Sequence, residues 1–222
     1  MCFSAEADLV AGIVVSGAGI DAIRHMRRRR DFPLAVLPLV FGIHQLIETF
    51  TWWELQGKVP EPVGLVAVWA YMVIAFGVVP VLVPAAIASA ETVWRRRRLM
   101  IPLVAVGGAV AGILLLRLLS SPPQAEIACR YLSYHTNLAY GGQIAMAYVG
   151  ATCGPMVLSS NRRMVAFGVA NLTMVGVLGW LLAAGVISLW CAGAAVTSFV
   201  IVVHFRRADQ PQEEVAALAA PA

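Results

Sequence analysis

Long apolar stretches separated by short polar clusters form the main pattern of this chain. A helix needs about 20 apolar residues to cross the roughly 30 Å hydrocarbon layer of a membrane. Seven stretches approach or exceed this length, over residues 6–23, 33–53, 63–90, 100–119, 143–159, 165–184 and 187–205. Lipid offers no hydrogen-bond partners, and the alternating strands of a membrane barrel are absent from the sequence. The pattern therefore predicts an all-α, polytopic membrane bundle of seven transmembrane helices.

Arginine clusters follow every second predicted helix. Of the 16 basic residues, 13 are in Arg24, Arg27–Arg30, Arg95–Arg98, Arg162–Arg163 and Arg206–Arg207. Cytoplasmic loops of membrane proteins are enriched in lysine and arginine. The clusters therefore predict an N-terminus outside the cell and a C-terminus in the cytoplasm.

The composition excludes several function classes. Of the 222 residues, 60% are hydrophobic and 13% charged, and the mean hydropathy is +0.80. Ordinary soluble domains are less apolar and more charged, so a nucleic-acid-binding domain, a cytosolic dinucleotide-binding enzyme and a secreted disulfide scaffold are excluded. The net charge of +4 is interpreted as a topology signal and as attraction to anionic membrane lipids.

The domain organisation follows from the same pattern. Residues 1–207 are predicted to form one transmembrane domain, and the polar tail 208–222 is expected to be disordered because it has little to bury. The outer loop, residues 120–142, is long for a connection between helices. Its segment 126–135 is interpreted as a short amphipathic segment that caps the bundle as a lid or anchors it at the interface.

Small residues at a spacing of four indicate close contacts between helices. Gly12 and Ser16 have this spacing in the first predicted helix, and Gly108 and Gly112 have it in the fourth. We expect both pairs to face a neighbouring helix.

Ionisable side chains within the second predicted helix are the strongest functional signal. His44 and Glu48 are four residues apart, so they share one helix face, with Gln45 beside them. Charged groups in lipid are costly, so this face is expected to point into the bundle. Other candidate residues map to the same outer half, where the first, second, fourth and seventh helices are expected to build a pocket under the loop. They are Cys2, Ser4, Glu6, Asp8, Arg117, His135, Trp190 and Cys191.

One interpretation of these residues is a metal site. Histidine, carboxylate and thiolate groups bind zinc and other transition metals. His44, Glu48 and His135, together with Cys2 or Cys191, would supply such ligands. A zinc-bound water activated by Glu48 or Glu6 as general base would permit hydrolysis.

Two other interpretations remain open. His44 and Glu48 could belong to a proton or ion path, or they could be a structural pair in which Arg117 neutralises the glutamate. A retinal chromophore is excluded, because its Schiff base requires a lysine within a helix. The one lysine of the sequence, Lys58, is predicted to lie in an outer loop.

Three motifs carry a resemblance to a known family. They are Met1–Ala5 (Met-Cys-Phe-Ser-Ala), Leu37–Glu48, and Ile187–Cys191 with its Ser-x-Trp-Cys signature. Together they resemble an uncharacterised bacterial family of multi-pass membrane proteins. The resemblance implies a location in the bacterial cytoplasmic membrane and marks Cys2, Ser4, Gln45, Glu48, Trp190 and Cys191 as motif positions without assigning them roles.

A more distant comparison is with the alkaline ceramidase and progestin-receptor-like superfamily of seven-helix zinc hydrolases. This chain lacks their paired histidines in the last helix, where His204 stands alone.

The leading hypothesis is an integral membrane protein with a polar, metal-binding pocket in its outer half, acting as a metal-assisted enzyme on a lipid or small amphiphile. The alternative is a non-enzymatic transporter, sensor or structural membrane protein in which His44, Glu48 and Arg117 form a buried polar network. The sequence does not decide whether the protein is an enzyme. Membrane lipids are the expected partners, and no nucleic acid is expected.

Overall fold

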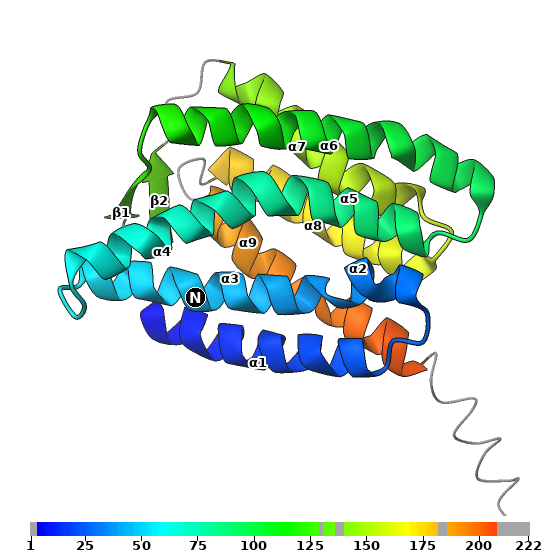
Figure 1. The fold of residues 1–222 in the computed structure, drawn as a ribbon, viewed down its shortest axis with the longest axis horizontal. Coiled ribbons are helices and arrows are strands. Elements are labelled where there is room, and N and C mark those ends of the chain that lie inside the picture. The colour runs from blue at the N-terminus through cyan, green and yellow to red at the C-terminus, as the bar shows by residue number, and fades with distance from the viewer. Residues whose placement is uncertain (1–3, 129–130, 136–139, 182–185, 208–222) are drawn as a thin grey trace, which may run out of the picture.

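The computed structural model describes residues 4–128, 131–135, 140–181 and 186–207. Within these residues, long helices run along one common axis, and a small β-hairpin lies at one end of the bundle (Figure 1). The elements are α1 (Ala5–Arg24), the 3₁₀ turn η1 (Arg29–Asp31), α2 (Phe32–Ala35), α3 (Leu37–Leu55), α4 (Glu61–Val73), the π-helical turn η2 (Ile74–Val78), α5 (Val79–Ala90), α6 (Trp94–Ser120), β1 (Gln124–Ala128), β2 (Tyr131–His135), α7 (Gly141–Leu158), α8 (Arg162–Leu181) and α9 (Val186–Thr197). Helical backbone resumes after Ser198 and continues to Arg207.

The helices coincide with the predicted apolar stretches. Five helical segments of the described chain are long and apolar enough to cross a membrane, which fits a membrane protein. They are Arg29–Leu55, Glu61–Ala90, Trp94–Ser120, Arg162–Leu181 and Val186–Arg207. Helices α1 and α7 cover two further predicted stretches but are not among these five. The predicted tail 208–222 lies outside the described residues.

The outer loop differs from the amphipathic segment expected from the sequence. It forms an antiparallel hairpin in which β1 pairs with β2, from Gln124 opposite His135 to Ala128 opposite Tyr131. Aromatic and β-branched residues favour strands, and the hairpin buries Leu132 and Tyr134 against the bundle. The all-α prediction therefore needs this one correction.

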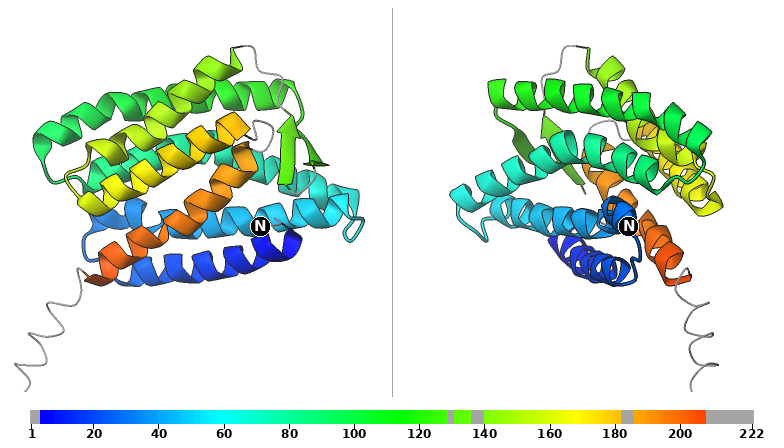
Figure 2. Two further views of the ribbon diagram at one scale, coloured as in Figure 1. Left: turned by 180° about the vertical axis from the view of Figure 1, so that it is seen from behind. Right: turned by 45° about the vertical axis from the view of Figure 1, so that its right-hand side comes forward.

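Helices α1 and α3 approach each other closely along most of their length. A Cβ atom at Gly12 would meet Leu46 of α3, and one at Gly42 of α3 would meet Ser16 of α1. The predicted Gly12 and Ser16 contact surface is therefore present in the structure. Helix α9 crosses this pair and contacts both members (Figure 2).

The small residues of α6 behave differently from the prediction. Nothing lies within 4 Å of a Cβ built on Gly108 or Gly112, so these residues do not mediate a helix contact in the structure. Gly107 does so instead, because a Cβ there would collide with the carbonyl oxygen of Pro80. The predicted contact at Gly108 and Gly112 is therefore wrong, because the helix turns a different face toward its neighbour.

A π-helical turn divides the third predicted stretch into α4 and α5. In such a turn, a carbonyl normally accepts from the N–H five residues ahead, and π-turns often mark functional sites. Pro80 has no N–H to offer to the carbonyl of Ala75. The hydroxyl of Tyr148 from α7 donates to that carbonyl at 2.6 Å and so satisfies it.

Candidate functional site

Helix α3 carries the most buried polar side chains of the bundle. His44, Gln45 and Glu48 have no solvent-exposed surface. The predicted burial of this helix face is therefore confirmed. The groups around it come from α1, α4, α9 and β2, so the site lies where the hairpin closes over one end of the bundle (Figure 1).

Three stacked rings connect α3, α4 and the hairpin. The imidazole of His44 stacks on Tyr71 with 3.8 Å between centroids, and Tyr71 stacks on Tyr134 with 4.7 Å between centroids. The hydroxyl of Tyr134 donates to Oε1 of Glu48 at 3.3 Å. The hairpin is therefore fastened over the carboxylate of α3 by both stacking and a hydrogen bond.

His44 and Glu48 have different partners although they share a helix face. His44 Nε2 lies 3.0 Å from the carbonyl oxygen of Tyr71, to which it donates. The Glu48 carboxylate instead has the side chains of Tyr71, Tyr134 and Ser188 around it. The predicted structural pair between His44 and Glu48 is not the arrangement that these contacts show.

A second buried carboxylate belongs to the same cluster. Asp8 of α1 is 3% exposed and accepts a hydrogen bond from Trp52 Nε1 at 2.8 Å. Asp8 is close enough to Glu48 for the negative charges of the two carboxylates to repel each other. The sequence places Asp8 among the polar residues of the outer half but assigns it no role as a ligand or catalytic group.

A signal for Asp8 was available in the sequence. The buried stripe of α1 has the alternating spacing of three and four expected for one helix face, and it consists of Ala5, Asp8, Gly12, Val15, Gly19 and Ala22. Asp8 is therefore on the contact face that Gly12 marks, whereas Glu6 is on another face.

Unused hydrogen-bonding capacity is concentrated in this region. Five buried side chains of this region, Glu48 among them, have polar atoms without a hydrogen-bond partner in the structure. These atoms are His44 Nδ1, Gln45 Oε1 and Nε2, Glu48 Oε2, Thr51 Oγ1 and Tyr71 Oη. Buried polar groups are nearly always hydrogen-bonded, and each unsatisfied one costs about 1–3 kcal/mol. The arrangement therefore favours a small polar species bound among them.

A small cavity borders the cluster at Cys191. Its volume is about 30 Å³, and its polar lining comes from Tyr148, Thr152, Asn171, Trp190 and Cys191. Space of this size is enough for a water molecule or a single ion. Cys191 is a free, half-buried cysteine whose thiol interacts with Tyr71 and Glu48, so it links the cavity to the carboxylates.

Two other predicted pocket residues have identifiable structural contacts. Ser4 accepts a hydrogen bond from the N–H of Ala7 at 3.3 Å and so caps α1. Trp190 donates through Nε1 to Asn171 Oδ1 at 3.2 Å. Asn171 is a buried polar residue of α8 that sequence reasoning did not single out.

Glu6 and Arg117 do not reach the cluster. Glu6 is exposed and lies 3.8 Å from Lys58. Arg117 is on an exposed position of α6, so the expectation that it neutralises Glu48 is wrong. Of the helices expected to build the pocket, the first, second and seventh (α1, α3 and α9) supply its groups, whereas α4 and β2 take the place of the fourth, α6.

The predicted metal ligands are described only in part. Cys2 and the side chain of His135 lie outside the described residues. Within the described part of the chain, no three histidine, cysteine, aspartate or glutamate residues are grouped closely enough to hold a metal ion. The oxygen atoms of the cluster outnumber its nitrogen and sulfur atoms, which is the donor set that hard cations prefer.

Comparison with known proteins gave one match. A family of unknown function, DUF6629, matches residues 1–216. No curated protein and no solved structure matches the chain.

Proposed function

We propose that this chain, which belongs to the DUF6629 family of unknown function, is a seven-helix integral membrane protein that binds a small cation in an occluded site. In this proposal the N-terminus is outside, and the site lies in the outer half of a bundle in the bacterial cytoplasmic membrane. The observation that carries it is the buried pair of Asp8 and Glu48, surrounded by polar atoms without partners.

The charge balance of the cluster supports a cation. Two carboxylates share this buried space, and Arg117, the basic residue expected to neutralise Glu48, is exposed on α6. An uncompensated buried charge is strongly destabilising, so each carboxylate needs a proton or a bound cation. Oxygen atoms of Gln45, Thr51 and Tyr71 are available to complete the coordination of a hard cation.

The geometry favours binding over hydrolysis. Glu48 has no exposed surface, and Tyr134 of the hairpin lies directly on its carboxylate. A general base must come within hydrogen-bond distance of the water or substrate proton that it removes. A lipid substrate would therefore require the hairpin to move, whereas a bare cation or a proton requires only a narrow opening.

A transition metal is the second possible occupant. His44 Nδ1 has no partner, and Cys191 adjoins the cluster through Tyr71. These groups would favour zinc if Cys2 or His135 completed the ligand set. The experiment below distinguishes zinc from hard cations.

The test is thermal unfolding of the detergent-purified protein, combined with elemental analysis of the same samples. Wild type is compared with Asp8→Asn, Glu48→Gln and the control Glu61→Gln, which removes an exposed carboxylate at the same end of the bundle. Samples are titrated separately with Na⁺, Mg²⁺, Ca²⁺ and Zn²⁺, and with pH in the absence of added metal. We expect a rise in Tm with one of these cations, or a pH dependence of Tm, that both site variants lose and the control keeps.

The outcomes separate the possible occupants. Stoichiometric zinc lost with Glu48→Gln would identify a transition-metal site, and a response to Na⁺, Mg²⁺ or Ca²⁺ would identify a hard-cation site. A pH response without any metal would identify the proton as occupant. If folded Asp8→Asn and Glu48→Gln respond to every cation and to pH as the control does, the proposal is refuted.

A further inference from the structure

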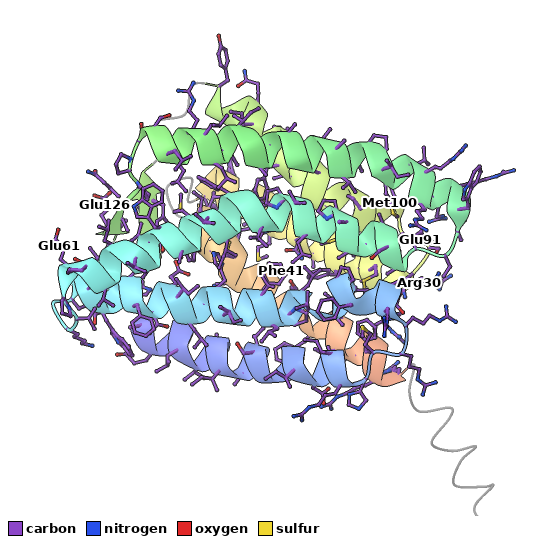
Figure 3. All side chains as sticks on the ribbon, in the orientation of Figure 1. Arg30, Phe41, Glu61, Glu91, Met100 and Glu126 are labelled. Carbon is purple, nitrogen blue, oxygen red and sulfur yellow. The ribbon has the colours of Figure 1, made fainter. Side chains whose placement is uncertain are left out.

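A cavity of about 370 Å³ lies at the opposite, arginine-rich end of the bundle. Figure 3 shows two of its residues, Arg30 and Glu91, at the end away from Glu61 and Glu126. Its walls come from the turn between α1 and η1, from η1 and α2, from the turns between α5 and α6 and between α7 and α8, and from the helical segment 199–207. Pockets for small ligands begin at about this volume.

One rim of the cavity is held by a fully engaged carboxylate. Glu91 Oε1 accepts from the N–H of Val93 at 2.8 Å and from the hydroxyl of Ser160 at 2.6 Å. Glu91 Oε2 accepts from the N–H of Ser160 at 2.8 Å and from the hydroxyl of Ser159 at 3.2 Å. The negative charge of Glu91 is therefore used to join two interhelical turns, which gives the cavity a fixed wall.

A second wall of the cavity contains His204, whose hydrogen bond defines its tautomer. Asn161 Oδ1 accepts from the N–H of Arg163 at 2.9 Å and thereby caps α8. Its Nδ2 lies 3.1 Å from His204 Nδ1, and an amide nitrogen can only donate. His204 Nδ1 is therefore the acceptor, which leaves Nε2–H as a donor on a residue that lines the cavity.

Positive charge exceeds negative charge in the lining. Three arginines, Arg27, Arg28 and Arg30, line the cavity together with two acidic residues, Asp31 and Glu91. Asp31 lies 3.8 Å from Arg30, and Glu91 is engaged as described. Arg28 has no ion-pair partner in the described part of the chain, so its guanidinium is available to an anion.

The N-terminus of α8 reinforces this field. Ser160 and Asn161 precede the helix and line the cavity. The positive end of the helix dipole therefore faces the same space as the arginines.

We propose that this cavity is a binding site for a phosphorylated ligand, with Arg28 and Arg30 as its principal charged contacts. Arginine presents a planar fork of donors that matches the oxygens of a phosphate. The hydroxyl of Thr92 and the imidazole of His204 supply further donors around the same space. The phosphate could belong to a lipid headgroup or to a soluble phosphate ester, because arginine clusters of membrane proteins lie at headgroup level.

The site is independent of the proposed cation site, which lies at the other end of the bundle.

The arginines of the neighbouring cluster Arg95–Arg98 differ from Arg28 in their contacts. Arg96 donates to the carbonyl oxygens of Leu158 and Ser159 and so caps α7, and Arg98 lies over the ring of Trp94. Those two arginines therefore have structural contacts.

The test compares two double variants with the same change in net charge. Arg28→Gln/Arg30→Gln alters the cavity, and Arg95→Gln/Arg97→Gln alters exposed arginines of α6 that do not line it. Full-length protein is placed in nanodiscs of phosphatidylcholine with increasing phosphatidylglycerol, and bound lipid is measured by native mass spectrometry. A separate calorimetric titration in detergent uses glycerol 3-phosphate as the soluble probe.

We expect the cavity variant to lose at least tenfold in affinity for one of the two probes, and the control to lose less than twofold. Loss confined to phosphatidylglycerol identifies a lipid headgroup, and loss of glycerol 3-phosphate binding identifies a soluble phosphate ester. Equal losses in both folded variants would show diffuse attraction to the surface and overturn the proposal. Absence of binding to either probe by wild type would overturn it as well.

Discussion

Substitution of Glu91 by glutamine tests whether its carboxylate holds together the turn between α5 and α6 and the turn between α7 and α8. We call this arrangement the clamp. Glu91 is 5% exposed, and its carboxylate accepts four hydrogen bonds, two at each oxygen. Glutamine keeps the shape but replaces one oxygen by an NH₂ donor. A serine hydroxyl can rotate to accept from this donor, but a backbone N–H cannot. In either amide orientation, the N–H of Val93 or of Ser160 therefore loses its acceptor and faces another donor.

The expected magnitude follows from these contacts. One buried N–H without an acceptor costs about 1–3 kcal/mol, and hydrogen bonds to a charged group are stronger than neutral ones by about 1 kcal/mol each. With part of this loss recovered by relaxation of the turns, we expect Glu91→Gln to lower the free energy of unfolding by about 3 kcal/mol. Ser160→Ala, which removes only one hydroxyl donor to this carboxylate, should cost about 1 kcal/mol.

The pH dependence provides a separate readout. Burial raises the pKa of Glu91, but the hydrogen bonds from Ser160, Val93 and Ser159 outweigh it, so the pKa lies below its usual value of 4.5. A carboxyl group whose pKa is lowered in the folded state contributes its full stabilisation at pH values above its pKa in the unfolded chain. This contribution is lost as the pH falls through its pKa in the folded protein. The difference between wild type and Glu91→Gln should therefore be constant above about pH 5.5 and shrink below pH 4.5.

The assay is equilibrium unfolding in mixed micelles, followed by tryptophan fluorescence, between pH 3.5 and 7. A Glu91→Gln protein within about 1 kcal/mol of wild type at pH 7 would refute the clamp. A pH-independent difference between the two proteins would show that the lost stability does not come from the ionised carboxylate.

Two further predictions concern the helix contacts that position the bundle. Gly107→Ala should lower the free energy of unfolding by about 2 kcal/mol, because the new Cβ would collide with the carbonyl of Pro80. The control Gly108→Ala places its Cβ in open space and should change the same free energy by less than about 0.5 kcal/mol. Equal effects of the two substitutions would show that the contact at Gly107 is not tight. Tyr148→Phe should cost about 1–2 kcal/mol in thermal or denaturant unfolding, because the carbonyl of Ala75 loses its donor; an unchanged stability would mean that another donor replaces the hydroxyl.

Part of the candidate site could be predicted from its residue types alone. Histidine and glutamate at a spacing of four in an apolar stretch must turn inward, and His44 and Glu48 are fully buried. Their partners could not be predicted, because Tyr71 and Tyr134 are aromatic residues whose positions depend on the path of α4 and of the hairpin. Asp8 could have been found from the buried stripe of α1, since it shares the face of Gly12.

The arginine-rich cavity could not be inferred from any local pattern. Its lining joins residues from four separate turns and helix ends, and each turn alone resembles an ordinary membrane-surface loop. The sequence does not distinguish Arg96, which caps α7, from Arg28, which faces the cavity. That distinction depends on which helix end lies beside each guanidinium.

The sequence by itself determined the helices and their capacity to cross a membrane, because the length and apolar content of a stretch decide whether its backbone can be satisfied in lipid. It also determined that His44 and Glu48 turn inward, since lipid exposure of either group is costly. Only the tertiary structure decided which faces meet, as Gly107 rather than Gly108 shows. It also brought Asp8 to Glu48 and closed the hairpin over them, because contacts between distant segments depend on packing that no local pattern specifies.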